Sequence, residues 1–548
     1  MSTADNSRQR FQIILFILFV AYLSLFYRLG ALPFSGSDEP RYARIAEEMV
    51  LSGDYVTPHL EGRPWLEKTP LLFWLESASY HVLGFSESSA RLPVALIALL
   101  GALGLAYAAY SLSGSRVGIL SLLMLLTSAM YAIFGRAAST DMPLAATFTW
   151  AALALYLTKR EPRWLWPLTC GVALGLAVLA KGPVAVVLLV GIGLIYLIVS
   201  GDRPWSLGQI ALIAVTGAFV SLPWFLFAWW QNGENFLIAF IVNHHMARFA
   251  TDIHHHSQPF WYYLPILLAG FFPWVFFLGS SVRRIWRERQ RPMDDDRLLE
   301  IYLWTWALIP FLFFTLSSSK LPGYILPVIP PLAYLAALEW ERYFKNDLSV
   351  YIPMKVQLAC LAAFSLVLGI ILIFGFHFKY NALWTGIGIA SPLALAAILG
   401  QLEFRRRRPA TLLTILVGGA ALTLAVIYLA ATPIMSKYHS ARDLSVAALG
   451  KISDQEPLVL YRYFHHSARY YAEFQTTRNA VGNIDQLRDY MLRHPQSTYI
   501  ILTQESGRKE LTETAGAKLL QGEGNLFLLE LSQISLSDKI DDWKHDGA

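Results

Sequence analysis

Four short segments of an otherwise apolar chain carry clusters of ionisable side chains. Their carboxylates could position an acceptor, take a proton or hold a divalent cation. Their lysine and arginine side chains could bind a phosphate, and arginine adds bidentate geometry. The candidate residues, in chain order, are Asp38, Arg41, Glu67, Lys68, Asp141, His244, His245, Arg248, Lys320 and Tyr324.

A phosphate-bearing lipid is the ligand that suits such a set of residues. Lys68, Arg248 and Lys320 would hold its phosphate, and the apolar segments around them would hold a polyprenyl chain. For any one charged residue at the end of a membrane span, the commoner explanation is that it snorkels to the interface or sets the topology. Four clusters on one side of the membrane favour a shared polar cavity.

The histidine-rich segment NHHMARFATDIHHH, residues 243–256, allows a metal site without requiring one. It lacks the HExxH spacing of helical zinc sites, so solvated loop histidines are the ordinary explanation for His254 to His256. His244 or His245 could instead join Glu67 around a divalent ion, zinc or another. The sequence leaves both alternatives open.

The composition places most of the chain in a membrane. The 548 residues are 55% hydrophobic and only 15% charged, whereas a soluble domain has about 25% charged residues. The net charge of +5 is too small to indicate nucleic acid as a partner. The sequence contains no glycine-rich phosphate loop, so no nucleotide cofactor is expected.

Apolar stretches predict a polytopic α-helical membrane protein with about 13 transmembrane helices, because a span needs about 20 mostly apolar residues. The spans are expected at 11–28, 90–111, 115–134, 141–158, 164–180, 183–200, 207–230, 262–281, 300–318, 322–340, 354–375, 382–401 and 410–431.

The basic loops predict the orientation of these spans. If the N-terminus is cytoplasmic, the lysine- and arginine-rich loops all fall on the cytoplasmic side. The candidate residues then lie on the outer side, and an odd number of spans places the C-terminus in the periplasm. The basic loops carry Arg116, Lys159, Arg160, Arg163, Arg203, Arg283, Arg284, Arg287, Arg289, Arg291, Arg342, Lys345 and Arg405 to Arg408.

The first outer loop, 29–89, is expected to contain two helices that lie in the membrane interface. Apolar residues between Tyr42 and Val50 recur at helical spacing, with Pro40 suited to the first turn and Gly53 to the end. A second apolar run, 71–83, is too short for a span.

The chain is expected to divide near residue 435. Residues 1–435 would form the membrane domain, and 436–548 a small periplasmic α/β domain, because short apolar runs there alternate with helical segments. These runs are 458–461, 499–502 and 526–531.

Several motifs together resemble those of the GT-C superfamily of glycosyltransferases. They are DEPRYA and WLEKTP in the first outer loop, then TDMP, HHMARF with FWYYLP, and KLPGYILP. Within the superfamily the chain is similar to the bacterial aminoarabinose transferases that modify lipid A, and more distantly to protein O-mannosyltransferases. The resemblance implies an inner-membrane enzyme that moves a sugar, aminoarabinose as the first expectation, from undecaprenyl phosphate to a lipid A-type acceptor at the outer face.

The resemblance also implies a role for each acidic candidate. Asp38 would be a catalytic carboxylate, and Arg41 would either support it or contact the phosphate of the substrate. Asp141 would be a second acidic residue of the cavity. Glu67 would contribute to catalysis and bind a metal ion, with His244 or His245 as its partner.

Four further residues match positions that contact the lipid carrier in the family. The resemblance implies that Lys68, Arg248 and Tyr324 bind the carrier phosphate, and Lys320 begins the KLP motif. The donor, the acceptor and membrane lipid are therefore the expected partners.

Two other functions remain to be weighed against this one. A GT-C transferase could use another polyprenyl-linked sugar and a protein or glycan acceptor. A transporter of lipid-linked sugar would more typically show internal repeats and charges at the membrane midplane, whereas the sequence shows no repeat and its ionisable residues cluster toward one face.

Overall fold

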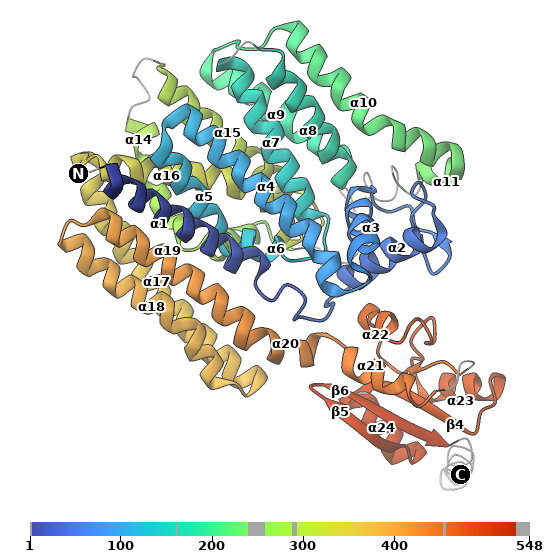
Figure 1. The fold of residues 1–548 in the computed structure, drawn as a ribbon. Helices are drawn as coiled ribbons and strands as arrows, with labels where there is room; N and C mark the ends of the chain where they lie inside the picture. Colours follow the sequence, from blue (N-terminus) through green and yellow to red (C-terminus); the bar gives the residue numbers. More distant parts are fainter. Residues whose placement is uncertain are drawn as a thin grey trace. The chain divides into compact units, whose positions relative to one another are not determined.

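A computed structural model describes residues 3–160, 163–238, 240, 258–287, 293–452 and 456–532 (Figure 1). The chain divides into two compact units. The first comprises Met1–Leu29, Ala46–His59 and Arg63–Leu429. The second comprises Gly30–Ile45, Leu60–Gly62 and Ala430–Ala548, so it combines the C-terminal part with two pieces of the first outer loop.

The first unit is built from helices. Within the described residues, seven helices are long and apolar enough to cross a membrane, or eight if one bent pair forms a single span, and four shorter apolar helices accompany them. The helices are α1 (Thr3–Ala21), η1 (Tyr22–Phe26), α3 (Leu71–Leu83), α4 (Glu87–Ser113), α5 (Ser115–Leu126), α6 (Ala129–Phe134), α7 (Asp141–Arg160), α8 (Leu165–Lys181), α9 (Val184–Ser200), α10 (Leu207–Asn232), α11 (Glu234–Leu237), α13 (Tyr263–Gly270), η3 (Trp274–Leu278), α14 (Gly279–Arg287), α15 (Asp295–Leu316), η4 (Pro322–Val328), α16 (Ile329–Phe344), α17 (Leu348–Tyr380), α18 (Leu383–Arg405) and α19 (Pro409–Val426).

The protein is therefore a polytopic helical membrane protein, as the sequence predicts, although some of the predicted spans are broken, bent or irregular. The span expected at 115–134 is broken between α5 and α6. The span expected at 262–281 bends by 102° between α13 and the η3–α14 pair, next to Pro273, which has no N–H to continue a helix. The span expected at 322–340 begins as the proline-containing 3₁₀-helix η4.

Small residues let the helices of the first unit approach closely. Helices α4, α7, α8 and α10 follow one another as packed neighbours, drawn from blue to green in Figure 1. On α8, Gly171 and Gly175 form a GxxxG face toward α10. A Cβ at Gly175 would lie 2.7 Å from Val220 Cβ, so any larger residue would push the two helices apart.

Ion pairs join loops that the sequence analysis places together on the cytoplasmic side. They connect the ends of α5 with α16, of α7 with the segment after α9, and of α7 with α15. This agrees with one shared face for the basic loops. The pairs are Arg116–Glu341, Lys159–Asp202 and Arg160–Asp295.

A network of four charged side chains connects α14, α15 and α16 on the same side. Arg284 contacts both Glu300, at 3.0 Å, and Glu339. Arg342 also contacts both carboxylates, with 2.7 Å to Glu339. The side chains of Glu300 and Glu339 are only 6% and 1% exposed. Two cations thus balance two buried carboxylates, which removes most of the cost of burying either.

The first outer loop contains both expected helices, α2 (Asp38–Ser52) and α3. The predicted apolar stripe of α2 is buried except for the half-buried Val50, and Gly53 ends the helix at φ +72° with its N–H donating to the Met49 carbonyl. A short hairpin not anticipated from the sequence, β1 (His59–Leu60) and β2 (Arg63–Pro64), follows. Its two turn residues, 61 and 62, both have positive φ, as a tight hairpin turn requires.

The second unit contains a four-stranded sheet of order β3-β4-β6-β5, with β3 and β4 parallel and the other pairs antiparallel. Alternate residues of β4 face opposite layers: 499 and 501 pack with α23 and α24, and 500 and 502 with α21 and α22. This confirms the small C-terminal α/β sheet region. Its elements are α20 (Thr432–His439), α21 (Arg442–Leu449), β3 (Val459–Leu460), α22 (His466–Tyr471), α23 (Ile484–Arg493), β4 (Thr498–Gln504), α24 (Glu505–Ala515), β5 (Lys518–Glu523) and β6 (Leu526–Ser532), with η5 (Ile427–Ala431) leading into α20.

Replacing Glu339 by glutamine should destabilise the protein by roughly 3–5 kcal/mol, because two half-buried guanidinium groups would then share one carboxylate. Thermal or denaturant unfolding of the purified protein in detergent measures this. Glu341→Gln is the matched control: it lies on the same helix and pairs with the half-exposed Arg116, so about 1 kcal/mol or less is expected. Equal losses in the two variants would contradict the account of the network.

Candidate functional site

A charge pair lies where two predicted outer segments of the first unit meet. Asp141 is the first residue of α7, and Lys181 is the last residue of α8. Their side chains form an ion pair and are only 17% and 16% exposed. The Lys181 ammonium also lies 4.4 Å from the centre of the Tyr324 ring, a cation–π geometry. Three polar side chains from α7, α8 and η4 thus form one cluster, which we call the head cluster.

Gly323 is what allows η4 to reach the head cluster. A Cβ at this position would lie 2.6 Å from the carboxyl carbon of Asp141 and 2.7 Å from the Phe134 ring. Neither neighbour is the far end of a long flexible chain, so a larger residue would displace Asp141 or η4. The structure therefore brings the TDMP and KLPGY motifs together through direct contact of their backbones and side chains.

Lys320 lies in the segment before η4 and has a different environment. Its side chain is buried, and its Nζ donates a hydrogen bond of 2.7 Å to the Ser317 carbonyl. This contact fixes the turn between α15 and η4. The predicted role of Lys320 in binding the carrier stays a prediction.

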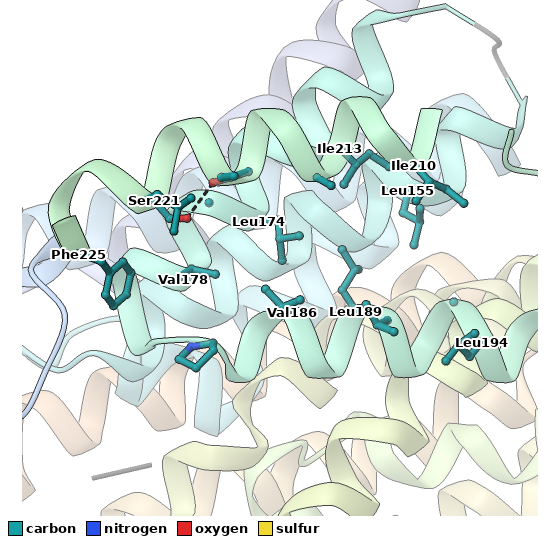
Figure 2. Close-up of a pocket in the computed structure, with 18 of the residues that line it drawn as sticks. Leu155, Leu174, Val178, Val186, Leu189, Leu194, Ile210, Ile213, Ser221 and Phe225 are labelled. Atoms are coloured by element: carbon teal, nitrogen blue, oxygen red, sulfur yellow. Dashed lines mark hydrogen bonds between the residues drawn. The ribbon is translucent and has the colours of Figure 1, made fainter. Parts of the chain in front are cut away.

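An apolar cavity of about 820 Å³ starts two residues from Lys181 (Figure 2). The chain turns through Gly182 after α8, and Pro183 lines the cavity at the start of α9. Figure 2 shows side chains of α8, α9 and α10 pointing into the same space. The Ser221 hydroxyl, one of its few polar groups, already donates to the Gly217 carbonyl within α10. The lining includes Leu174, Val178, Val186, Leu189, Gly193, Ile213 and Phe225.

The first-loop residues Glu67 and Lys68 are half-buried in the turn between β2 and α3. The stretch before the hairpin is tied to α10, one of the cavity helices. The Trp224 indole donates to the Val56 carbonyl at 3.0 Å, and the Thr57 hydroxyl donates to Gln231 at 2.8 Å. These bonds attach the first-loop part of the first unit to the end of α10.

Asp38 and Arg41 belong to the second unit. Asp38 occupies the first turn of α2, where a negative charge is favourable. Its carboxylate accepts a hydrogen bond of 2.5 Å from Arg41, whose Nε also donates to the Ser37 carbonyl at 2.9 Å. The guanidinium therefore fixes the orientation of Asp38 and leaves the carboxylate partly exposed, as a general base requires.

His466 of α22 lies within electrostatic reach of this pair. Burial, together with the positive charges of Arg41 and Arg469, lowers the pKa of His466 to about 4, although Asp38 acts in the opposite direction. The imidazole is therefore neutral near pH 7 and adds no third positive charge beside Asp38.

Three predicted site residues, His244, His245 and Arg248, lie outside the described residues. Within the part of the chain that the structure describes, no group of three or more His, Cys, Asp or Glu side chains could hold a metal ion. A metal site shared by Glu67 and one of these histidines therefore stays a prediction.

Lys181 is the residue of the head cluster that the sequence analysis missed. It falls in the two-residue gap between the predicted spans 164–180 and 183–200. The signal was available in the segment VLAKGPVA, where a lone lysine ends an apolar helix on the predicted outer side. Ionisable residues placed in this way usually have a partner that can be sought on neighbouring helices.

Several known proteins are similar to this chain in sequence. Residues 67–230 match the family of dolichyl-phosphate-mannose-protein mannosyltransferases. The undecaprenyl phosphate-alpha-4-amino-4-deoxy-L-arabinose arabinosyl transferase of Edwardsiella ictaluri is 34% identical over 60% of this chain and 61% of that protein. A second transferase of this name, from Proteus mirabilis, is 29% identical over 66% of each chain. The matches thus span less than two thirds of the relatives' own length.

Two solved structures share the fold over nearly the whole chain. ArnT from Cupriavidus metallidurans bound to undecaprenyl phosphate has a TM-score of 0.75 and 24% identity. The apo state of the same protein has a TM-score of 0.73 and 25% identity. Each comparison covers 96% of this chain and 98% of ArnT. The predicted resemblance is confirmed: the chain is similar to the aminoarabinose transferases, part of it matches the mannosyltransferase family, and it shares the fold of ArnT.

Proposed function

We propose that the protein transfers aminoarabinose from undecaprenyl phosphate to a lipid A-type acceptor at the outer face of the bacterial inner membrane. The names of the curated relatives support this sugar and carrier, and the ArnT structure contains undecaprenyl phosphate. One observation in this chain carries the proposal: Lys181, which joins Asp141 and Tyr324 in the head cluster, lies in the chain between Val178 and Pro183, and these two residues line an apolar cavity.

This arrangement suits an amphiphile with a charged head and a hydrocarbon tail. The cavity volume of about 820 Å³ lies within the range of roughly 300–1,000 Å³ typical of ligand pockets. Its lining is almost entirely apolar, so it would favour hydrocarbon over a sugar or a peptide. We assign it to the first isoprene units of the carrier, with the remainder of the chain among the membrane lipids.

The proposed reaction breaks one bond at the anomeric carbon and forms another. The bond from this carbon to the carrier phosphate breaks, and cations such as Lys68 and Arg248 stabilise the charge that grows on the leaving phosphate. Tyr324 would donate a hydrogen bond to the same phosphate. An acceptor oxygen forms the new glycosidic bond, and a hydroxyl acceptor would pass its proton to Asp38. A phosphate acceptor would need orientation more than deprotonation.

The Asp141–Lys181 pair would keep the end of the cavity polar at little electrostatic cost. Each charge compensates the other, so the pair can stay ionised next to an apolar space. Lys181 then presents its ammonium to the Tyr324 ring and to the carrier head group, and Asp141 holds Lys181 in place. Lys320 supports the same turn through its bond to Ser317.

We also propose the complete topology of 13 spans, with a cytoplasmic N-terminus and a periplasmic C-terminal unit. The shorter helices α8 and α9 count as spans because the Lys181 turn between them belongs with Asp141 on the outer side. The ion pairs that join the basic loops on the opposite side support the alternation.

A divalent ion, zinc or another, is proposed as a further component. The carboxylate of Glu67 and an imidazole of His244 or His245 are ligands that zinc accepts. Glu67 is half-buried, which suits a ligand held next to a cavity. When bound, such an ion would supply a positive charge near the acceptor or the phosphate.

A second candidate function differs in sugar and acceptor. The match of residues 67–230 to the mannosyltransferase family supports transfer of another polyprenyl-linked sugar to a protein or glycan. The same residues would bind the carrier phosphate, so an assay with several donors and acceptors separates the two candidates.

Lys68→Ala and Asp38→Ala should each lower sugar transfer by about 100-fold or more, because each removes a group that acts on developing charge or on the proton. Purified protein in lipid nanodiscs, supplied with undecaprenyl-phosphate aminoarabinose and lipid A, measures the rate. Lys345→Ala, an exposed lysine on the predicted cytoplasmic side, is the control and should keep the wild-type rate. Wild-type rates in both site variants, with folding intact, would refute the site assignment.

Gly193→Phe should weaken binding of the natural donor by filling the cavity. A Cβ at Gly193 meets only the Trp205 ring, at 3.7 Å, so the new side chain has room to enter the cavity. We expect KM for a long-chain donor to rise about tenfold, because one or two buried methylene contacts would be lost. KM for a short-chain donor should change little. Ile198→Phe, on the exposed face of the same helix, is the control. An equal effect on both donors would contradict the assignment of the cavity.

A further inference from the structure

The second unit holds the first-loop segment Gly30–Ile45 at both of its ends. Near the start, the Phe34 ring is fully buried and packs edge-on against Tyr470, with ring centres 5.1 Å apart. The Phe34 N–H donates to the Tyr471 hydroxyl at 2.7 Å. Near the end, the Arg44 guanidinium lies 4.7 Å over the centre of the Phe474 ring.

A buried ion pair holds the tip of the β1–β2 hairpin to the same part of the second unit. Arg469, from α22, contacts Glu61 at 2.6 Å, and its side chain is only 9% exposed. Its Nε also donates to the Thr476 hydroxyl at 3.3 Å. A guanidinium buried to this degree depends on a paired carboxylate, so removing either partner carries a large penalty.

A residue of the first-loop hairpin and a residue that follows α22 both have strained backbone conformations near this contact. Glu61 has φ +58° and Phe474 has φ +63°, a region that costs a non-glycine residue roughly 1–2 kcal/mol. Such conformations persist only where the surroundings fix them, and they gather at sites where geometry matters. Here Glu61 is fixed by Arg469, and Phe474 is covered by Arg44.

All these contacts come from one short stretch, His466 to Phe474, which we call the α22 clamp. It reaches the first-loop pieces at Phe34, Arg44 and Glu61. His466, its first residue, is the neutral neighbour of Asp38 and Arg41. The segment that carries the proposed catalytic carboxylate is therefore packed as part of the second unit.

We propose that Arg469 is a positioning residue for sugar transfer, and that the C-terminal unit is an obligatory part of the transferase because its α22 clamp holds the segment that carries Asp38. The catalytic part of this proposal rests on the proposed function. If the second unit were instead a separately folded appendage, loss of one ion pair within it would leave sugar transfer unchanged.

The kinetic test compares Arg469→Ala, Arg469→Lys and Glu61→Gln in the nanodisc assay. As a positioning residue, Arg469 acts through the segment that carries Asp38. Arg469→Ala should therefore lower kcat by about 10- to 100-fold, the effect of a misplaced catalytic group, and leave KM for the donor nearly unchanged. Arg469→Lys keeps the charge and should restore part of kcat, as should the hydrogen-bonding Glu61→Gln. Arg508→Ala breaks a partly exposed pair with Glu505 in α24 of the same unit and should leave kcat unchanged.

Hydrogen exchange on the same proteins gives a readout that does not depend on activity. In Arg469→Ala, amides of residues 30–45 and 58–64 should exchange faster, while β4 and β6 keep their protection. This separates release of the first-loop segment from unfolding of the whole unit.

Faster exchange in these segments together with the loss of kcat supports the proposal. Unchanged exchange there, or faster exchange with wild-type kcat, overturns it, and so does loss of protection throughout β4 and β6. If the wild-type protein transfers no sugar, the proposed function fails, and the exchange data alone decide whether Arg469 holds the first-loop segment.

Discussion

A charged side chain among apolar helices needs a partner of opposite charge, and this requirement fixes how the helices of the first unit meet. On the predicted cytoplasmic side, Arg284 and Arg342 share Glu300 and Glu339 and thereby join α14, α15 and α16. On the opposite side, Lys181 forms an ion pair with Asp141 and thereby joins α8 to α7. Apolar packing in a membrane is permissive, because lipid competes for the same surface, so these pairs supply much of the specificity.

The same constraint explains why the candidate site combines a polar head cluster with an apolar cavity. A charge pair can persist next to hydrocarbon only if it is compensated locally, and the Asp141–Lys181 pair meets that condition. Gly323 lets Tyr324 approach the pair, and the Gly182–Pro183 turn leads directly into the cavity wall. A lipid-linked phosphate has the matching division into charged head and apolar tail, which is why the geometry favours it over a soluble sugar nucleotide.

The sequence predicts the elements of this protein better than their contacts. Hydrophobic periodicity located α2, and short apolar runs located α3 and the strands β3, β4 and β6, because burial leaves a local signal in the sequence. These signals did not reveal the break between α5 and α6, the hairpin at Glu61, or the pairing of Lys181. Those features depend on residues far apart in sequence: the partner of Lys181 lies 40 residues earlier, and that of Glu61 lies 408 residues later. The motifs around Asp38, Lys68 and Tyr324 carried the family resemblance, but they did not predict the contacts of the α22 clamp.

The central claim concerns the sugar and its acceptor, and lipid A itself provides the most direct record of both. Mass spectrometry of lipid A should be compared between a strain that makes this protein and the same strain without it, with a supply of the carrier-linked sugar in each. The account predicts a mass increment of one aminoarabinose, or of two, only in the strain that makes the protein. Identical lipid A spectra from the two strains would contradict it.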